Sequence, residues 1–218
     1  MQLLPPLPNP GKIICIGLNY VDHSAEVGIA LPDYPTVFAR FSSSLIGHAA
    51  PVAVPRQSIQ FDYEGELVAV IGHGGRNISR EQALDHVAGY SIFNDITVRD
   101  YQFRTPQWTM GKNFDGTGVF GPAFVTADAL PPGCKGLDLT TRLNGEVVQH
   151  APIAAMVVDV ETLVSLLSEV FTLSPGDVIV TGTPSGIGMS RKPPLWMKPG
   201  DVCEVEISSL GVLRTPIT

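Results

Sequence analysis

The sequence FDYEGELVAVI, residues 61–71, decides how this chain folds. The segment is short, rich in β-branched and aromatic residues, and followed by Gly72, a pattern that predicts a β-strand. Side chains two positions apart in a strand point to the same face, so Glu64 and Glu66 should lie side by side. Both faces continue with apolar residues and should be covered: Val68 and Val70 on the glutamate side, and Leu67, Ala69 and Ile71 on the other.

Two neighbouring glutamates on a covered strand need a cationic partner. Carboxylates are rarely buried without one, and two of them side by side repel each other. A divalent ion such as Mg²⁺, Mn²⁺ or Ca²⁺ would serve, because oxygen ligands suit these ions. A strand end in solvent, with the glutamates paired to Lys or Arg, agrees equally well with this segment. Both interpretations stay open on these residues alone.

The composition describes a well-cored protein without a basic surface. Of the 218 residues, 44% are hydrophobic and 16% are charged, which excludes a disordered chain. The 22 Gly and 19 Pro residues are spread along the chain and indicate many turns between short strands. A formal charge of −7 without a basic stretch argues against a nucleic-acid partner.

The cysteines and the hydropathy pattern suggest a compartment. Cys15, Cys134 and Cys203 have no paired spacing, so we expect reduced thiols in a cytoplasmic protein. No apolar stretch is long enough to span a membrane, and the N-terminus lacks the pattern of a signal peptide. We expect one domain over residues 1–218, beginning with a Pro-rich arm over residues 1–11.

Hydrophobic periodicity and turn residues predict an α+β chain that is mainly β. Asn144-Gly145 is a two-residue hairpin signal, and Ser79 with Gln82 forms a capping-box pattern. Residues 99–118 are predicted to form a long polar and aromatic loop, which in a compact domain is usually functional or disordered. Strands are expected at 12–18, 36–41, 52–54, 61–71, 87–93, 121–126, 137–143, 146–150, 178–181 and 202–207, and helices at 19–26, 80–86 and 159–171.

A second polar group, Asn94-Asp95-Ile96-Thr97-Val98-Arg99-Asp100-Tyr101-Gln102, follows one of these strands. Asp95 ends the strand, where a carboxylate can turn toward a site on a neighbouring strand. If a helical turn begins here, Asp95, Arg99 and Gln102 share one face. The structural alternative is an Asp helix cap with an i,i+4 ion pair between Asp95 and Arg99.

Four motifs, in this order and spacing, resemble the fumarylacetoacetate hydrolase family. The resemblance runs from about Lys12 to the C-terminus, and the chain length is similar to the short single-domain branch of acylpyruvases and oxaloacetate decarboxylases. It implies a mixed β-sandwich or roll like that family's C-terminal domain, with a few short helices, and a homodimer. The motifs are DYEGELVAVIG (62–72), NDITVRDYQ (94–102), GKNFD (111–115) and TGTPSGIG (181–188).

The resemblance also implies a metal site. Glu64, Glu66 and Asp95 match three carboxylates that hold Mg²⁺ or Mn²⁺, with Ca²⁺ as a substitute in crystals. Lys112 matches the lysine of the GKNFD motif, whose ammonium would stabilise developing enolate charge beside the metal. A small anionic 2-oxo acid would displace metal-bound water by chelation.

His23 and Glu26 lie three residues apart, on one face of a helical turn. A carboxylate can orient an imidazole and keep its pKa near neutrality. The segment resembles a short active-site helix that carries a water-activating His–Glu dyad and acts as a lid, and residues 28–32 would suit its hinge. Further matches imply roles for other side chains: charge stabilisation by Gln102, and substrate binding by Arg99, Gly182, Thr183, Arg40 and Arg104.

These residues imply a Mg²⁺- or Mn²⁺-dependent enzyme that acts on a C–C bond beside a ketone. Hydrolysis of acylpyruvates such as fumarylpyruvate is the first expectation. Oxaloacetate decarboxylation and 2-hydroxyhepta-2,4-diene-1,7-dioate isomerisation are alternatives, because they demand the same electron sink. A rival of another class is a non-catalytic protein whose metal braces the β-scaffold or binds an oxo acid. Lys112 and the His23–Glu26 pair argue against that rival, since a structural site needs neither.

Overall fold

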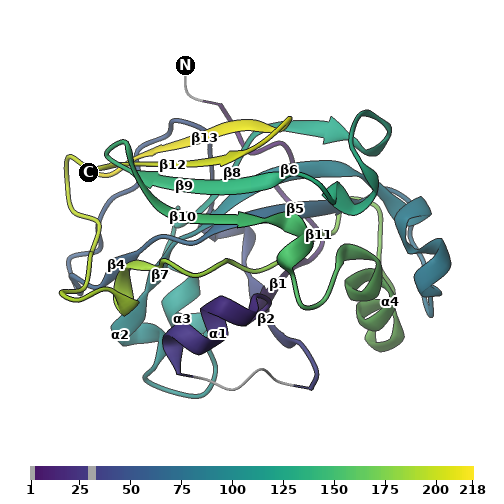
Figure 1. Cartoon of the computed structure of the whole chain (residues 1–218), viewed down its shortest axis with the longest axis horizontal. Helices are drawn as coiled ribbons and strands as arrows, with labels where there is room; N and C mark the ends of the chain where they lie inside the picture. The colour runs from purple at the N-terminus through teal and green to yellow at the C-terminus, as the bar shows by residue number, and fades with distance from the viewer. Residues whose placement is uncertain (1–2, 29–32) are drawn as a thin grey trace.

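The computed structural model describes residues 3–28 and 33–218, with only the backbone of Val27. Of the hinge predicted at 28–32, Gly28 alone therefore belongs to the described residues, and residues 1–2 of the Pro-rich arm also lie outside them. Figure 1 shows strands stacked in layers, with three short helices gathered below them and a longer one at one end. The helices are α1 (Val21–Val27), α2 (Arg99–Gln102), α3 (Thr109–Lys112) and α4 (Val160–Val170).

In spatial order, the strands of the larger sheet are β2 (Thr36–Arg40), β1 (Ile13–Gly17), β11 (Val178–Val180), β5 (Gly65–Ile71), β6 (Val87–Asp95), β8 (Gly118–Thr126) and β3 (Leu45–Gly47). The β1–β11 and β3–β8 pairs are parallel and the others antiparallel. The sheet is therefore mixed. Strand β11 lies between β1 and β5, so segments from opposite ends of the chain meet at its centre.

A second, antiparallel sheet stacks on the first. In spatial order, its strands are β10 (Glu146–Pro152), β9 (Asp138–Leu143), β12 (Val202–Ile207) and β13 (Gly211–Pro216). Figure 1 shows these strands lying over β5, β6 and β8, with which they are in contact. Leu67 and Ile92 from the larger sheet share one buried cluster with Leu139 and Val205 from the smaller sheet. The predicted mixed β-sandwich is confirmed, and the main core lies between its two sheets.

The two faces of β5 enter different clusters, as its alternating pattern predicts. Leu67, Ala69 and Ile71 belong to the core between the sheets. Val68 and Val70 belong to a smaller cluster on the outer face of the larger sheet. Leu7 from the Pro-rich arm packs against that smaller cluster. Both faces of the strand are therefore covered, and the adjoining glutamates lie inside the protein.

Turn and cap residues act largely as predicted. The Asn144-Gly145 turn joins β9 to β10 with φ angles of 53° and 86°, which fits a two-residue hairpin turn that glycine accommodates readily. Helix α1 ends at Gly28 in the left-handed conformation. Helix α4 begins after Asp159, whose carboxylate accepts the backbone N–H of Thr162.

The strand predicted over residues 61–71 is divided in two. A short strand β4 (Phe61–Asp62) pairs with β7 (Thr97–Val98), and β5 begins only at Gly65. Side chains replace the sheet partners at the break: Glu64 N–H donates to Asn94 Oδ1 at 3.1 Å, and Gly65 N–H donates to Gln149 Oε1 at 3.0 Å. Amide side chains from distant parts of the sequence thus allow the chain to pass from one strand pairing to another at this point. Local periodicity does not reveal such a break in a strand.

Other predictions are corrected by the structure. Residues 80–86 form a 3₁₀ helix, and Ser79 Oγ contacts Gln82 Oε1 at 3.5 Å without capping a backbone N–H. The loop predicted at 99–118 contains α2, α3 and the start of β8. Strands β3 and β13 were not predicted. The 3₁₀ helices are η1 (Ser42–Ser44), η2 (Arg80–His86), η3 (Ala127–Ala129), η4 (Pro132–Cys134), η5 (Ile153–Ala155) and η6 (Gly188–Ser190).

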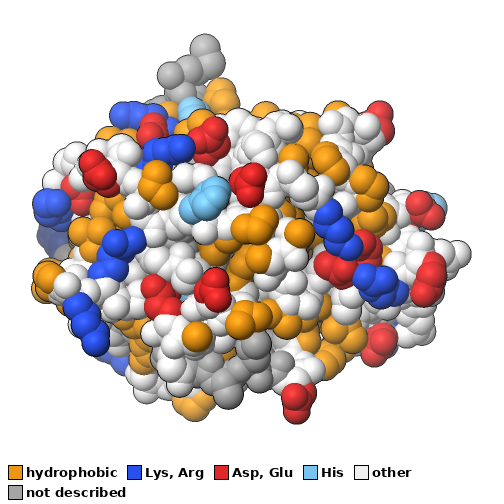
Figure 2. All heavy atoms as spheres, in the orientation of Figure 1, with side chains coloured by type: hydrophobic (Ala, Val, Ile, Leu, Met, Phe, Trp, Pro, Cys, Tyr) orange, Lys and Arg blue, Asp and Glu red, His pale blue; other side chains and the backbone are white. Residues whose placement is uncertain are grey.

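The surface carries both kinds of charge. Figure 2 shows acidic and basic side chains interspersed on one face, with hydrophobic side chains between them. Within the described part of the chain, no helix has the length and apolar character needed to cross a membrane.

Candidate metal centre and substrate pocket

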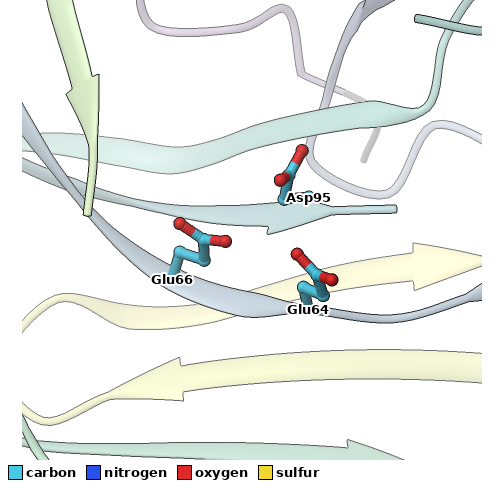
Figure 3. A group of neighbouring side chains, drawn as sticks. All are labelled: Glu64, Glu66 and Asp95. Carbon is cyan, nitrogen blue, oxygen red and sulfur yellow. The ribbon is translucent and has the colours of Figure 1, made fainter. Parts of the chain in front are cut away.

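The three carboxylates expected to bind metal meet inside the protein. Glu64 directly precedes β5, Glu66 lies within β5, and Asp95 ends the neighbouring strand β6. One ligand oxygen from each lies within 4.8 Å of the other two, and all three residues are buried. Figure 3 shows the side chains gathered where β5 and β6 run side by side. A +2 ion of ordinary size suits this group of oxygens.

Glu66 has the least compensated charge of the three. Gly182 N–H donates to its Oε2 at 2.5 Å, but no ion pair among the described residues includes Glu66. Burial raises the pKa of Glu66, and the adjacent charges of Asp95 and Glu64 raise it further. A buried carboxylate in this position needs a cation beside it. Glu66 therefore has the property expected of a metal ligand.

Lys112 projects its ammonium between the other two carboxylates. Its Nζ lies 2.6 Å from Glu64 Oε2 and 2.6 Å from Asp95 Oδ2. Burial alone would lower the pKa of Lys112, but Asp95 and Glu64 outweigh burial and raise it, so the side chain stays charged. Gly111 makes this position possible, because a Cβ there would lie 2.4 Å from the backbone nitrogen of Gln102.

Arg99 connects the carboxylates to α2. Its Nε donates to Asp62 Oδ2 at 2.8 Å, and its Nη2 lies 2.7 Å from Glu64 Oε1. Its Nη1 donates to Gln102 Oε1 at 2.9 Å. The alternative of an Asp95–Arg99 pair on one helix is wrong, because α2 begins only at Arg99 and Asp95 still belongs to β6.

Arg40 takes a position different from the one expected for it. Its side chain is 0% exposed and forms a short ion pair with Asp95. It also donates to Thr117 Oγ1 at 3.2 Å and to the carbonyl of Ile96 at 2.6 Å. Arg40 therefore contacts one of the carboxylates expected to bind metal, from within the protein interior. Arg104 stacks on the ring of Tyr101 at 3.8 Å, and its substrate contact stays a prediction.

The net charge of the buried groups around the site favours binding of a divalent cation. Four carboxylates meet three cations here, a balance of −1 before any metal is counted. A +2 ion changes that balance to +1, which suits an anionic substrate. The charged groups are Asp62, Glu64, Glu66 and Asp95, and Arg40, Arg99 and Lys112.

One pocket brings together most of the side chains selected from the sequence. The selected residues that line it are His23, Glu64, Glu66, Arg99, Gln102, Lys112 and Thr183. Glu26, Asp95 and Gly182 touch members of this group. Apolar side chains of Phe38, Trp108 and Ile187 complete the walls. The pocket thus combines a polar floor for charged oxygens with apolar sides, the usual pattern of a small-molecule site.

His23 and Glu26 form a pair at the edge of this pocket. His23 is 7% exposed, and its Nδ1 lies 3.5 Å from Glu26 Oε2. Gly186 N–H donates to both carboxylate oxygens of Glu26, at 2.9 and 3.0 Å, and Ser190 Oγ donates to Oε1 at 2.5 Å. Burial alone would raise the pKa of Glu26, but the nearby His23 and hydrogen bonds from Ser190 and Gly186 lower it, so it stays ionised.

Thr183 follows β11 and is held between the two sheets. Its Oγ1 donates to the carbonyl of Gly65 at 3.0 Å and accepts from Gln149 Nε2 at 2.8 Å. The side chain is 3% exposed and lines the pocket. Its hydroxyl is thus fixed by partners from both sheets.

Sequence reasoning missed several residues that shape this site. Asp62 belongs to the first motif but looked like part of a regular strand, whereas it anchors Arg99. Gln149 lies in β10, 84 residues after the backbone N–H it binds, and no local pattern marks it. Trp108 stands close to Lys112 in the sequence. Its ring packs edge-on against Phe38 at 5.5 Å. A Trp close to a glycine-containing motif was the sequence signal that could have identified it as a pocket residue.

The family model for the C-terminal domain of fumarylacetoacetate (FAA) hydrolase matches residues 12–218. The mitochondrial oxaloacetate tautomerase fahd2 of Xenopus laevis is 44% identical over 219 residues, covering 100% of this chain and 68% of the relative. Among solved structures, a putative HpcE protein from Mycobacterium smegmatis has a TM-score of 0.95 at 39% identity, covering 100% of this chain and 77% of that one.

Another similar structure contains a bound metal ion. Fumarylpyruvate hydrolase from Pseudomonas aeruginosa, solved in complex with Mn²⁺ and pyruvate, has a TM-score of 0.85 at 33% identity, covering 95% of this chain and 89% of that one. The family model, the identity to fahd2 and the shared fold agree with the motifs and the buried carboxylates described above. This chain belongs to the fumarylacetoacetate hydrolase family of enzymes.

Proposed function

We propose that this protein is a divalent-metal-dependent enzyme that moves a proton at the carbon beside the 2-oxo group of a small diacid, with oxaloacetate as the substrate. The observation that carries the proposal is that His23 lines the same pocket as Glu64, Glu66 and Lys112. A base beside a site for a chelated oxo acid is what keto–enol tautomerisation requires. The 44% identity to an oxaloacetate tautomerase supports this choice of substrate.

Glu64, Glu66 and Asp95 would hold the ion, which we expect to be Mg²⁺ or Mn²⁺. When bound, such an ion supplies Lewis acidity to the 2-oxo and carboxylate oxygens of a chelating substrate.

His23 is the proposed base. Nδ1 lies 3.5 Å from the Glu26 carboxylate, and the imidazole keeps Nε2 as its second nitrogen for the substrate. Nε2 accepts a proton from C3 of the keto form, which leaves an enolate, and protonated His23 then gives that proton to the enolate oxygen to form the enol. In the reverse direction, Nε2 takes the proton from the enol hydroxyl and returns it to C3. Glu26 holds the ring orientation and favours its charged form while the proton resides there.

Lys112 and Gln102 are placed to stabilise negative charge on the substrate. The Lys112 ammonium is fixed by two carboxylates at the pocket floor. Arg99 Nη1 donates a hydrogen bond to Gln102 Oε1. Among the described residues, none accepts a hydrogen bond from Gln102 Nε2, so this group can donate to a substrate oxygen. Arg99 itself, predicted to bind substrate, acts in this proposal by orienting Gln102. The Thr183 hydroxyl is the proposed contact for a substrate carboxylate, to which it would turn its proton from the Gly65 carbonyl.

A second candidate is hydrolysis of an acylpyruvate such as fumarylpyruvate. The same His23–Glu26 pair favours it, because a base that removes a proton from carbon can also remove one from water. The fold shared with a fumarylpyruvate hydrolase at 33% identity supports it further. Water would attack the distal carbonyl, the C–C bond would break, and pyruvate enolate would take up a proton.

One substrate panel separates these reactions. Tautomerisation removes the near-ultraviolet band of freshly dissolved oxaloacetate enol without releasing pyruvate. Decarboxylation releases pyruvate, and hydrolysis removes the band of fumarylpyruvate. We expect the first result with Mg²⁺ or Mn²⁺ and its loss in EDTA. Pyruvate release without faster enol conversion would reject the tautomerase. Stabilisation by metal without any turnover would favour the non-catalytic alternative.

His23→Asn tests the base directly. We expect it to lower the tautomerisation rate by roughly two to four orders of magnitude, the usual contribution of a general base. His73→Asn is the matched control, because His73 is exposed and its ring contacts His86 at 5.4 Å, outside the pocket lining. An unchanged rate in the His23 variant would remove this residue from the mechanism.

A further inference from the structure

Glu26 is bound more tightly by the loop opposite it than by its histidine partner. Gly186 N–H and the Ser190 hydroxyl donate to it at 2.5–3.0 Å, whereas His23 Nδ1 lies 3.5 Å away. These donors come from the chain around η6, about 160 residues further along the sequence. A carboxylate that accepts this many hydrogen bonds remains ionised and held in place.

The loop that offers these donors is itself rigidly held. Asp62 accepts the backbone N–H groups of Gly188 at 2.7 Å and Met189 at 3.0 Å. Tyr63 Oη donates to the carbonyl of Gly186 at 3.0 Å. Asp62 and Tyr63 immediately precede Glu64, so the same short segment that supplies a metal ligand also fixes the loop facing α1.

Ser190 has two acceptors for its single proton. Its Oγ lies 2.5 Å from Glu26 Oε1 and 2.8 Å from the carbonyl oxygen of Ile187. The proton serves one acceptor at a time, and the shorter distance and the negative charge favour Glu26. Removing the hydroxyl should therefore affect the contact with α1 more than the fold of the loop, which Asp62 and Tyr63 hold independently.

We propose that the Ser190 hydroxyl and the Gly186 amide form a receptor for the Glu26 carboxylate, and that Ser190 is a positioning residue that aligns α1 and, through it, His23. The part that concerns His23 rests on the proposed function. The receptor itself does not, because it is a contact between two segments of the chain. Ser190 acts through Glu26 and does not touch the substrate.

Hydrogen exchange of the α1 amides in the whole protein tests the receptor without any substrate. In Ser190→Ala we expect these amides to exchange about 5- to 20-fold faster, the effect of losing one charge-assisted hydrogen bond. Exchange in β5 and β6 should not change. Ser190→Thr retains a hydroxyl and should restore protection. Ser185→Ala is the matched control, because among the described residues the donors to Glu26 from this loop are Gly186 and Ser190.

Steady-state kinetics with oxaloacetate and Mn²⁺ test the alignment. We expect Ser190→Ala to lower kcat by about 5- to 20-fold and to change KM by less than about 2-fold, because substrate contacts remain. Unchanged α1 exchange in Ser190→Ala would overturn the proposal, as would faster exchange throughout the protein, which would indicate a purely structural role. Faster α1 exchange in a protein whose wild type does not convert oxaloacetate would support the receptor and reject the proposed function.

Discussion

Replacing Glu66 with Gln should stabilise the metal-free protein and weaken the stabilisation that a metal ion provides. Glu66 is buried beside Asp95 and Glu64 and belongs to no ion pair among the described residues. Gln has the same shape and can still accept the Gly182 N–H through its amide oxygen. The substitution thus removes a charge and a metal ligand while preserving the packing.

The sign of the metal-free effect follows from the pKa of Glu66. Burial, with the charges of Asp95 and Glu64, raises this pKa in the folded protein. A group whose pKa rises on folding contributes stability below its unfolded pKa of about 4.3 and loses that contribution as the pH rises. At pH 7 wild-type Glu66 is therefore a cost. We expect Glu66→Gln to stabilise the metal-free protein by about 1–3 kcal/mol, the usual penalty of a poorly partnered buried polar group.

With metal present the wild type gains more stability than the variant. An ion at 100 times its Kd stabilises the wild type by about 2.7 kcal/mol. At about 2–4 °C per kcal/mol for a chain of this size, this is a rise in Tm of about 5–11 °C. Glu66→Gln retains two of the three carboxylates, and we expect its rise to fall to about 1–2 °C at the same metal concentration, because a loss of about 100-fold in affinity leaves the ion at only about its Kd.

Differential scanning calorimetry in EDTA and in MnCl₂ measures both effects. Glu206→Gln is the matched control, because Glu206 is a partly exposed β12 carboxylate paired with Arg142 at 2.6 Å, and it should keep the full rise with Mn²⁺. A Glu66→Gln protein that is less stable in EDTA and retains the wild-type response to Mn²⁺ would refute this account of the site.

Three further substitutions test the surrounding structure. Arg40→Met leaves Asp95 buried without its guanidinium partner and should cost about 3–5 kcal/mol in urea unfolding, so a loss below about 1 kcal/mol would contradict the buried ion pair. Asp159→Ala removes the cap of α4 and should cost about 1 kcal/mol at pH 7. Burial alone would raise the pKa of Asp159, but hydrogen bonds from Thr162 and nearby cations lower it. A lowered pKa gives stability that is present above the unfolded value of about 3.9 and lost as the pH falls, so wild type and variant should converge in acid, and a constant difference down to low pH would argue otherwise. Gly145→Ala places a Cβ at a φ of 86° and should cost about 1 kcal/mol, measured by thermal unfolding.

The fold was predictable where short-range patterns determine it. The alternation in residues 67–71 correctly assigned each side chain of β5 to one of two clusters. The Asn144-Gly145 turn marked its hairpin, and the apolar spacing of 159–171 marked α4. Strand β13 escaped prediction because the interleaved polar and small residues of 211–216 resemble a loop. Its strand conformation comes from pairing with β12, a tertiary contact.

The sequence predicted which residues belong to the site but not which ion pairs they form. The motifs and the His23–Glu26 segment selected seven of the side chains that line one pocket. Spacing along the chain suggested that Arg99 faces Asp95, whereas Arg99 binds Asp62 and Arg40 binds Asp95. The reason is physical, because which cation meets which anion depends on how β2, β6 and α2 are placed in space. A sequence reveals the types of buried charge, and the fold decides their pairing.

The central position of β11 has a consequence for synthesis on the ribosome. Strand β11 (Val178–Val180) pairs on one side with Ile13–Cys15 and on the other side with Val68–Val70. During synthesis the position between β1 and β5 therefore stays unfilled until residues 178–180 have been translated. Fragments that end before residue 178 would expose two unpaired strand edges, which invite aggregation. This sheet becomes complete when residues 178–180 emerge, and not when its first strands do.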